Sequence, residues 1–211
     1  KKPEPRLLLL LAFATGMLAV LITLPIEAVS AQYIPLGFLL ILAWAATEEI
    51  AKFVLAWITV LRRSAVDEPI DNPVYLITVA LGFATLENAF FLFTPIAQKG
   101  FFGWFVTGDL RFIGATLIHV LCSSLIGGAL ALAHYGERRE KILYGGVGVI
   151  LAIALHTTFN SLIISTGAGS VLVVFMGVWV GIVFLLLALE RVKIIRRPAW
   201  WEKIFMRRNA Q

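Results

Sequence analysis

The sequence predicts an all-α membrane protein, a polytopic bundle of about six transmembrane helices with both termini in the cytoplasm. Hydrophobic residues make up 60% of the chain and charged residues only 15%, whereas soluble proteins are about 45–50% apolar and about 25% charged. Each of six apolar stretches approaches or exceeds the roughly 20 residues that a helix needs to cross a bilayer. Lysine and arginine residues also gather in the connections on one side, as cytoplasmic loops of membrane proteins do.

The expected spans follow one another along the chain. They cover about residues 7–25, 36–61, 73–97, 110–134, 142–165 and 169–189. The first could instead belong to a signal peptide, because basic residues precede it and Val29-Ser30-Ala31 resembles a cleavage site. Its apolar stretch is longer than the roughly 7–15 residues usual in signal peptides, so we expect a retained span.

The connections between the spans support this topology. Residues 62–73 are polar and rich in turn-forming residues, and they lie on the basic side. Residues 98–109 form an expected loop on the other side, where their aromatic residues suit a membrane interface. The only basic residues on that outer side are Lys99 and Arg111.

The distribution of charge divides the chain into two parts. Residues 1–190 form an expected integral-membrane domain, and residues 191–211 form a basic, amphipathic tail on the cytoplasmic membrane surface. Because the tail adjoins a membrane span, anionic lipid headgroups rather than nucleic acids are its expected partners. The single cysteine, Cys122, excludes an intrachain disulfide.

Five ionisable residues interrupt the apolar spans at similar depth. They are Glu48, Glu49, Glu87, His119 and His156. Three unpaired glutamates would cost on the order of 10 kcal/mol in a bilayer, so these side chains must pair, bind an ion or stay protonated. At about 1.5 Å per residue, four spans carry an acid or an imidazole about 18–22 Å from the cytoplasmic end. We therefore expect these side chains to converge in one layer of the bundle.

Imidazole and carboxylate groups together form a ligand set that suits a divalent metal such as zinc. A nearby glutamate could then take a proton from a water molecule. Lys52 lies three residues after Glu49 and four after Glu48, so buried ion pairing accounts for one glutamate but leaves the other groups unexplained.

Two other function classes stay open from these residues alone. The buried acids and histidines could relay ions in a proton or divalent-metal transporter or channel. The chain could also be a non-catalytic membrane scaffold, although a scaffold does not need the glutamates and histidines together. No inverted repeat is evident in the sequence, which disfavours a transporter.

Four short motifs occur in order between residues 48 and 160, about half of the chain. The motifs are Glu48-Glu49-x-x-Lys52; Glu68-Pro69-Ile70-Asp71 through Tyr75 with Gly82-Phe83-Ala84-x-x-Glu87-Asn88; Arg111 and His119 followed by Gly127; and His156-x-x-x-Asn160. Together they resemble the PrsW family of intramembrane proteases, which are relatives of the CAAX-processing endopeptidases. Phe91 departs from the pattern, since a tyrosine is expected after the Glu-Asn pair.

The resemblance implies an intramembrane endopeptidase that cuts a membrane-anchored protein. In bacteria the family is associated with the first cut of single-pass anti-sigma factors, so a single-pass membrane protein is the expected substrate. The expected location is a bacterial or archaeal cell membrane, which the chain crosses several times. The resemblance leaves two mechanisms open, a zinc enzyme or a metal-free site in which glutamate and histidine activate water, and it does not determine the oligomeric state.

The resemblance implies that Glu48 and Glu49 are catalytic and that His119 and His156 lie in the site, and with our reading of the other motif residues the expected site falls into three groups. The expected catalytic residues are Glu48, Glu49 and Asn160, with a glutamate as general base and the asparagine as hydrogen-bond donor to the developing oxyanion. The expected metal ligands are His119, His156 and Glu87, with zinc as the expected ion. The residues expected to support them are Lys52, Arg111 and Asn88.

Overall fold

The computed structural model describes residues 3–165 and 168–196, with side chains for all of these except 92–113 and 168–172. This part of the chain contains helices and no strand. The elements are α1 (Arg6–Tyr33), α2 (Phe38–Ala56), the π-helical turn η1 (Trp57–Leu61), α3 (Asp71–Leu132), α4 (Arg138–Ser165) and α5 (Ala168–Lys193). The prediction of a polytopic helical bundle is confirmed.

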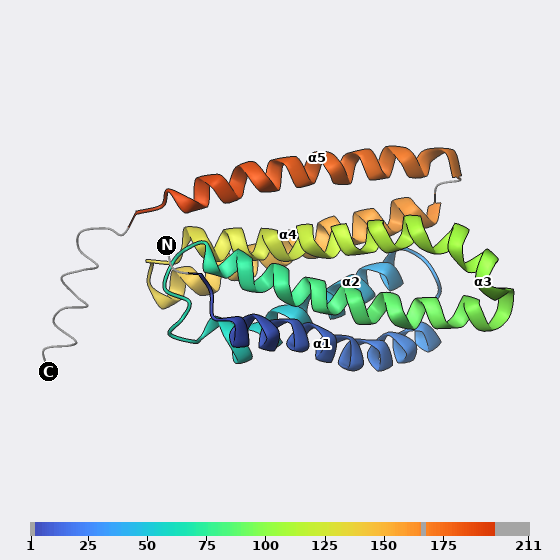
Figure 1. The fold of residues 1–211 in the computed structure, drawn as a ribbon, viewed down its shortest axis with the longest axis horizontal. Coiled ribbons are helices and arrows are strands. Elements are labelled where there is room, and N and C mark those ends of the chain that lie inside the picture. Colours follow the sequence, from blue (N-terminus) through green and yellow to red (C-terminus); the bar gives the residue numbers. More distant parts are fainter. Residues whose placement is uncertain (1–2, 166–167, 197–211) are drawn as a thin grey trace, which may run out of the picture.

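Helix α3 consists of two antiparallel legs that are joined by a reversal of the chain (Figure 1). Asn88 of the first leg donates a hydrogen bond to Thr116 of the second over 3.2 Å. The prediction of a loop over residues 98–109 is wrong, because this stretch is helical. It contains glycines but no proline, and a proline would remove a backbone hydrogen bond from a helix.

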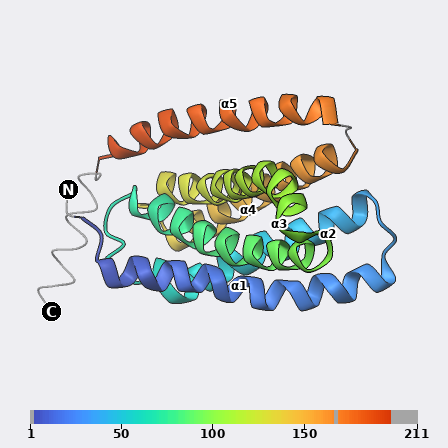
Figure 2. The ribbon, with the colours of Figure 1, turned by 45° about the vertical axis from the view of Figure 1, so that its right-hand side comes forward.

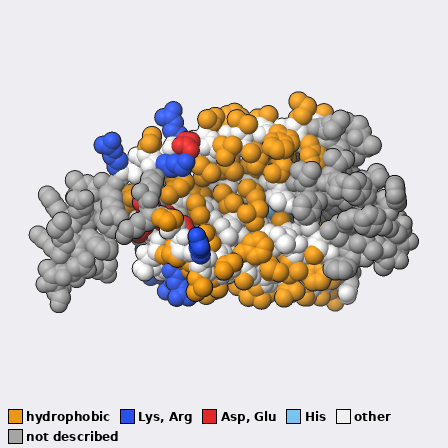
Figure 3. Space-filling model, viewed as in Figure 1, with side chains coloured by type: hydrophobic (Ala, Val, Ile, Leu, Met, Phe, Trp, Pro, Cys, Tyr) orange, Lys and Arg blue, Asp and Glu red, His pale blue; other side chains and the backbone are white. Residues whose placement is uncertain are grey.

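One end of the bundle holds the start of α1, the connection from η1 to α3, the connection from α3 to α4 and the end of α5 (Figure 1 and Figure 2). Lysine and arginine side chains gather at this end, whereas hydrophobic side chains cover the long face of the molecule (Figure 3). We call it the basic end, defined by Arg6, Arg62, Arg63, Arg138 and Arg191. The arrangement matches the predicted topology, and the cytoplasmic location of this end stays a prediction.

Five helical stretches are long and apolar enough to cross a membrane. They are Arg6–Tyr33, Asp71–Phe91, Gly114–Leu132, Arg138–Ser165 and Val173–Lys193. Helix α2 is not among them, because its 19 residues contain Glu48, Glu49 and Lys52. It nevertheless packs against α1, α3 and α4, in the position of the remaining predicted span. The helix that carries Glu48, Glu49 and Lys52 is therefore flanked by three helices that contain spanning stretches.

Helix α1 packs so closely against the first leg of α3 that the backbones of the two helices are in contact. A Cβ atom on Gly16 would lie 1.9 Å from the carbonyl oxygen of Val79, and one on Gly82 would lie 2.0 Å from that of Phe13. Only glycine permits such an approach between helices. The helix also continues through Pro25 to Tyr33, so the residues that resemble a signal-peptide cleavage site lie inside it.

Helix α5 lies along one side of the bundle (Figure 1 and Figure 2). Only 6% of its spanning stretch is buried, against 33% for α1. A cavity of about 1190 Å³ separates it from α4 and from the second leg of α3. We call this cavity the α5 groove, and its lining includes Gly128, Leu151, Val173, Gly177 and Phe184.

Candidate active site

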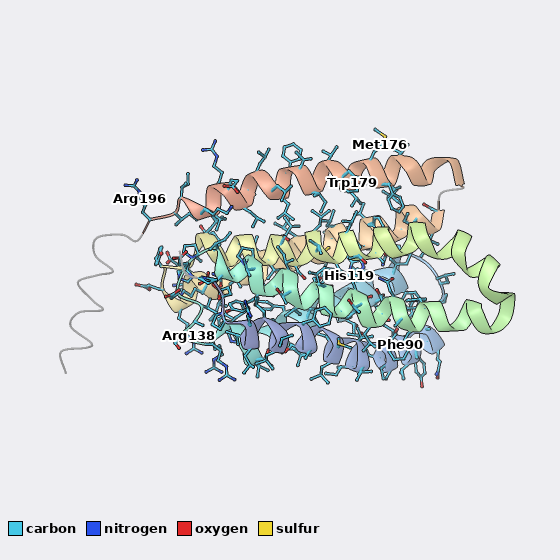
Figure 4. All side chains as sticks on the ribbon, viewed as in Figure 1. Phe90, His119, Arg138, Met176, Trp179 and Arg196 are labelled. Atoms are coloured by element: carbon cyan, nitrogen blue, oxygen red, sulfur yellow. The ribbon has the colours of Figure 1, made fainter. Side chains whose placement is uncertain are left out.

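Three helices bring polar side chains together inside the bundle. Glu48, Glu49 and Lys52 come from α2, His119 from the second leg of α3, and His156 from α4. Their exposed fractions lie between 0% and 5%. Figure 4 shows His119 about midway along the bundle, between Arg138 at the basic end and Phe90 nearer the other end. These residues form what we call the buried centre.

Glu49 accepts two hydrogen bonds at the same oxygen. Its Oε1 is 2.7 Å from Nζ of Lys52 and 2.8 Å from Nδ1 of His156. Helical geometry places Glu49 and Lys52, three residues apart, on one face of α2. The sequence left open which glutamate pairs with the lysine, and the contact selects Glu49. The Lys52 ammonium and the Glu49 carboxylate are both buried. Each compensates the charge of the other, which the low-dielectric interior requires.

His119 lies between Lys52 and Glu87. Its Nδ1 is 3.0 Å from Nζ of Lys52, and its Nε2 is 2.9 Å from Oε2 of Glu87. An ammonium can only donate and an ionised carboxylate can only accept, so Nδ1 is the acceptor and Nε2 carries the proton. Glu87 therefore fixes the tautomer and the orientation of His119, as carboxylates do for histidines that bind metals.

Glu48 faces both imidazole rings through an oxygen that has no hydrogen bond. Its Oε2 is 3.8 Å from Nδ1 of His119 and 4.0 Å from Nε2 of His156. The Oε2 atom of Glu49 is also buried and has no hydrogen-bond partner among the described residues. Unpaired buried oxygens are uncommon in folded proteins. These two glutamate oxygens therefore indicate a site for an ion or a water molecule, which the side chains themselves do not supply.

The geometry of the donor atoms fits a divalent metal ion. One ligand atom each from Glu48, Glu49, His119 and His156 lies within 4.8 Å of the others. Ligands at about 2.0–2.1 Å from a tetrahedral zinc ion lie roughly 3.3 Å apart. The distances of 3.8 Å and 4.0 Å from Glu48 to the two rings are therefore close to what such a site needs. Lys52 would have to move away from Nδ1 of His119 for that atom to bind the ion.

The charges of the buried centre also fit a divalent ion. When ionised, Glu48, Glu49 and Glu87 carry three negative charges, and the only positive charge among the described interior side chains is that of Lys52. The balance is two negative charges, which a divalent cation would neutralise. Burying such an imbalance without compensation is costly in a low-dielectric interior.

The other predicted site residues lie around this centre or outside the described side chains. Glu87 contacts Nε2 of His119 and is not one of the four residues that could hold a metal together. Asn160 is half-buried and lies one helical turn after His156. Asn88 joins the two legs of α3 through Thr116. The side chain of Arg111 falls outside the described residues.

The sequence reasoning missed one carboxylate near the buried centre, that of Glu27 in α1. Glu27 interacts electrostatically with Glu87, Glu48 and Lys52. The first span was expected to end near residue 25, so Glu27 seemed to lie outside it, whereas α1 continues to Tyr33. The available signal was the apolar sequence that continues after Pro25 and contains this single acid.

The chain is similar to known proteins over the region that contains these residues. Residues 4–188 match the family described as PrsW family intramembrane metalloprotease. The chain is 27% identical over 124 residues to a protein named Protease PrsW from Geobacillus kaustophilus, covering 59% of this chain and 51% of that protein. It is 26% identical over 113 residues to Protease PrsW from Bacillus subtilis, covering 54% of this chain and 48% of that protein.

The matched region spans about half the length of these two curated relatives. No solved structure matches the chain. The family match nevertheless covers most of the sequence, and the glutamates and histidines of the predicted motifs meet inside the bundle. The chain therefore belongs to the PrsW family of intramembrane metalloproteases.

Proposed function

We propose that this chain hydrolyses a peptide bond of a membrane-anchored protein within the bilayer. The observation that carries the proposal is the buried centre, where Glu48, Glu49, His119 and His156 offer ligand atoms within 4.8 Å of one another. The unpaired oxygens on the two glutamates give water activation a place to occur. A site of this kind suits hydrolysis, because it combines a proton acceptor with groups that can hold a metal ion.

Glu49 is proposed as the general base. Lys52 and His156 hold its Oε1, so its Oε2 is left to take a proton from water while the water oxygen bonds to the scissile carbonyl carbon. The same oxygen then gives the proton to the leaving nitrogen as the carbon–nitrogen bond breaks. The atoms balance, since one water is consumed and one acid and one amine are produced.

His119, His156 and Glu48 are proposed to hold the metal ion, with zinc as the expected species. A bound ion would polarise the scissile carbonyl and the attacking water. Glu87 would hold Nε2 of His119 in place, a contact that usually accompanies metal-binding histidines. Asn160 would donate a hydrogen bond to the oxygen that gains negative charge.

The proposed substrate is a single-pass membrane protein whose cleaved bond can reach the middle of the bilayer, with an anti-sigma factor as the specific case to test. The proposal rests on the depth of the buried centre (Figure 4) and on the family of the chain. The bilayer is the expected environment, since five described stretches are apolar enough to span it.

The test uses the purified chain in liposomes with candidate single-pass substrates, with and without a chelator. Glu49→Gln should slow cleavage by about 10²–10⁴-fold, as expected for loss of a general base, while bound metal is retained. Glu48→Gln and His156→Ala should lower both cleavage and metal content. Glu190→Gln is the matched control, because this glutamate is 68% exposed and pairs with Lys193.

Mass spectrometry identifies the cleaved bond, and elemental analysis of the purified protein measures the metal. Normal cleavage by Glu48→Gln, Glu49→Gln and His156→Ala would reject the site. Cleavage that resists complete metal removal but still requires Glu49 would reject the metal and leave a glutamate and histidine mechanism.

A further inference from the structure

The carboxyl group of Glu27 takes no part in the hydrogen bonds between its helix and Trp44 of α2. Trp44 of α2 donates its indole hydrogen to the backbone oxygen of Glu27 at 3.2 Å and to Oγ of Ser30 at 3.0 Å. The contact between α1 and α2 therefore uses the main chain of Glu27 and leaves its side chain available. The Oε1 atom is buried and has no hydrogen-bond partner among the described residues.

This side chain borders the buried centre from a helix that contributes no other part of it. Glu27 interacts electrostatically with Glu87, with Glu48 and with Lys52. Helix α1 starts at the basic end, and Glu27 lies in its last two turns, towards the opposite end. The residue as a whole is only half-buried. Glu27 thus lies between the buried centre and the end of the bundle away from the basic residues.

When ionised, Glu27 carries a negative charge that the groups described around it do not balance. Lys52 is the only basic residue with a described side chain that interacts with Glu27, and Lys52 already donates to Glu49. A divalent ion at the buried centre would neutralise the remaining charge there and leave that of Glu27 over. Buried carboxylates are usually paired with a cation.

We propose that Glu27 binds a cationic side chain, lysine or arginine, of the substrate next to the scissile bond. The inference rests on the proposed peptidase function and deepens it to a preference for substrate charge. A metal ion is the less suitable cation, because Glu27 is not one of the four residues whose ligand atoms lie within 4.8 Å of one another. Because Glu27 as a residue is half-buried, a long side chain that enters from outside the bundle can instead reach its carboxyl group.

The experiment compares matched substrates with the full chain in liposomes. Once the cleaved bond is known, each of the three positions on either side of it is set to lysine, glutamine or glutamate. For the one substrate position whose side chain contacts Glu27, Glu27→Gln should lower kcat/KM of the lysine substrate by about ten- to a hundredfold. This is the usual range for a hydrogen bond to a charged group. The loss should appear mainly in KM, and kcat/KM for the glutamine substrate should stay unchanged.

Charge reversal gives the sharpest form of the test. Glu27→Lys should reverse the preference, so that the glutamate substrate is cut faster than the lysine substrate. Ser30→Ala is the matched control, because it removes a hydrogen bond to Trp44 one turn away without changing charge, and it should cut all substrates with the wild-type preference. Elemental analysis should find wild-type metal content in every variant.

Three results would overturn the inference. They are an equal loss on lysine and glutamine substrates, a loss of bound metal in Glu27→Gln, and a reversal variant that keeps the wild-type preference. Failure of the proposed function would look different, since the wild type would then cut none of the substrates. Gel filtration of Glu27→Gln checks folding, which we expect to be intact because the contact with Trp44 uses the backbone.

Discussion

Glycines on two sides of the bundle have opposite surroundings. In the contact between α1 and α3, a Cβ on Gly16 or Gly82 would lie 1.9 Å or 2.0 Å from a backbone oxygen. In the α5 groove, a Cβ on Gly128 or Gly177 would meet no atom within 4 Å. Helix α1 and the first leg of α3 are thus packed to the limit of approach, whereas α5 leaves room beside Gly128 and Gly177. The difference indicates that the contact between α1 and α3 depends on close packing and that these two positions in the α5 groove do not.

We expect the largest loss of stability when a charge in the buried centre loses its partner. Lys52→Met should lower the free energy of unfolding by about 3–5 kcal/mol, because it leaves the Glu49 carboxylate buried without its cation. Unfolding by SDS in mixed micelles, followed by circular dichroism, measures the change. The double variant with Glu49→Gln should recover part of the loss, since the uncompensated charge is gone.

Lys193→Met provides the control for that variant. Lys193 pairs with Glu190 at the basic end, where the two side chains are 45% and 68% exposed. A surface pair of this kind contributes only about 0–1 kcal/mol. Equal losses for Lys52→Met and Lys193→Met would mean that the charges of the buried centre are solvated.

The backbone contact between α1 and α3 should be the next most sensitive feature. Gly82→Ala should cost about 1–3 kcal/mol or more, because the new methyl group forces the two helices apart. The same SDS titration measures it. If the separation also shifts Glu27 or Glu87, cleavage should fall as well. A neutral Gly82→Ala would contradict the close approach.

Loss of the hydrogen bond between the two legs of α3 should lower the free energy of unfolding by a smaller amount. Asn88→Ala removes the hydrogen bond to Thr116 and should cost about 1 kcal/mol. Thr116→Val should have a similar effect, and combining the two should add little, because both remove the same bond. Fully additive losses in the same titration would show that the two side chains act separately.

A substitution in the α5 groove should change the free energy of unfolding least. Gly177→Ala should change the free energy of unfolding by less than about 0.5 kcal/mol, or raise it slightly, since alanine favours helix over glycine. No described atom lies within 4 Å of the new methyl group. A loss as large as that of Gly82→Ala would mean that the α5 groove is closed in the membrane.

Composition and charge were sufficient to predict most of the fold, for clear physical reasons. Apolar runs of span length and the one-sided basic residues predicted the helices and their order. The expected first span ended near residue 25, whereas α1 continues through Pro25 to Tyr33, since proline is tolerated inside membrane helices. The reversal of α3 was expected as a loop because its residues are less apolar than the spans.

The residues of the candidate site could be predicted, but their contacts could not. Both glutamates stand at helical spacing from Lys52, so the choice of Glu49 depends on how α2 is rotated against α4 and His156. Spacing along the chain cannot tell that Glu87 contacts Nε2 of His119, because this contact crosses the two legs of α3. Glu27 was missed together with the end of its helix.

The charged helix α2 has a consequence for how the protein enters the membrane during synthesis. A central charge costs roughly 2.5–3.5 kcal/mol on insertion scales, so α2 is a poor candidate for release into lipid by itself. Glu49 can neutralise Lys52 within the helix at once, but its other partner, His156, is made 107 residues later. We therefore expect the nascent α2 to stay beside the insertion machinery, or against α1, until α4 has emerged from the ribosome.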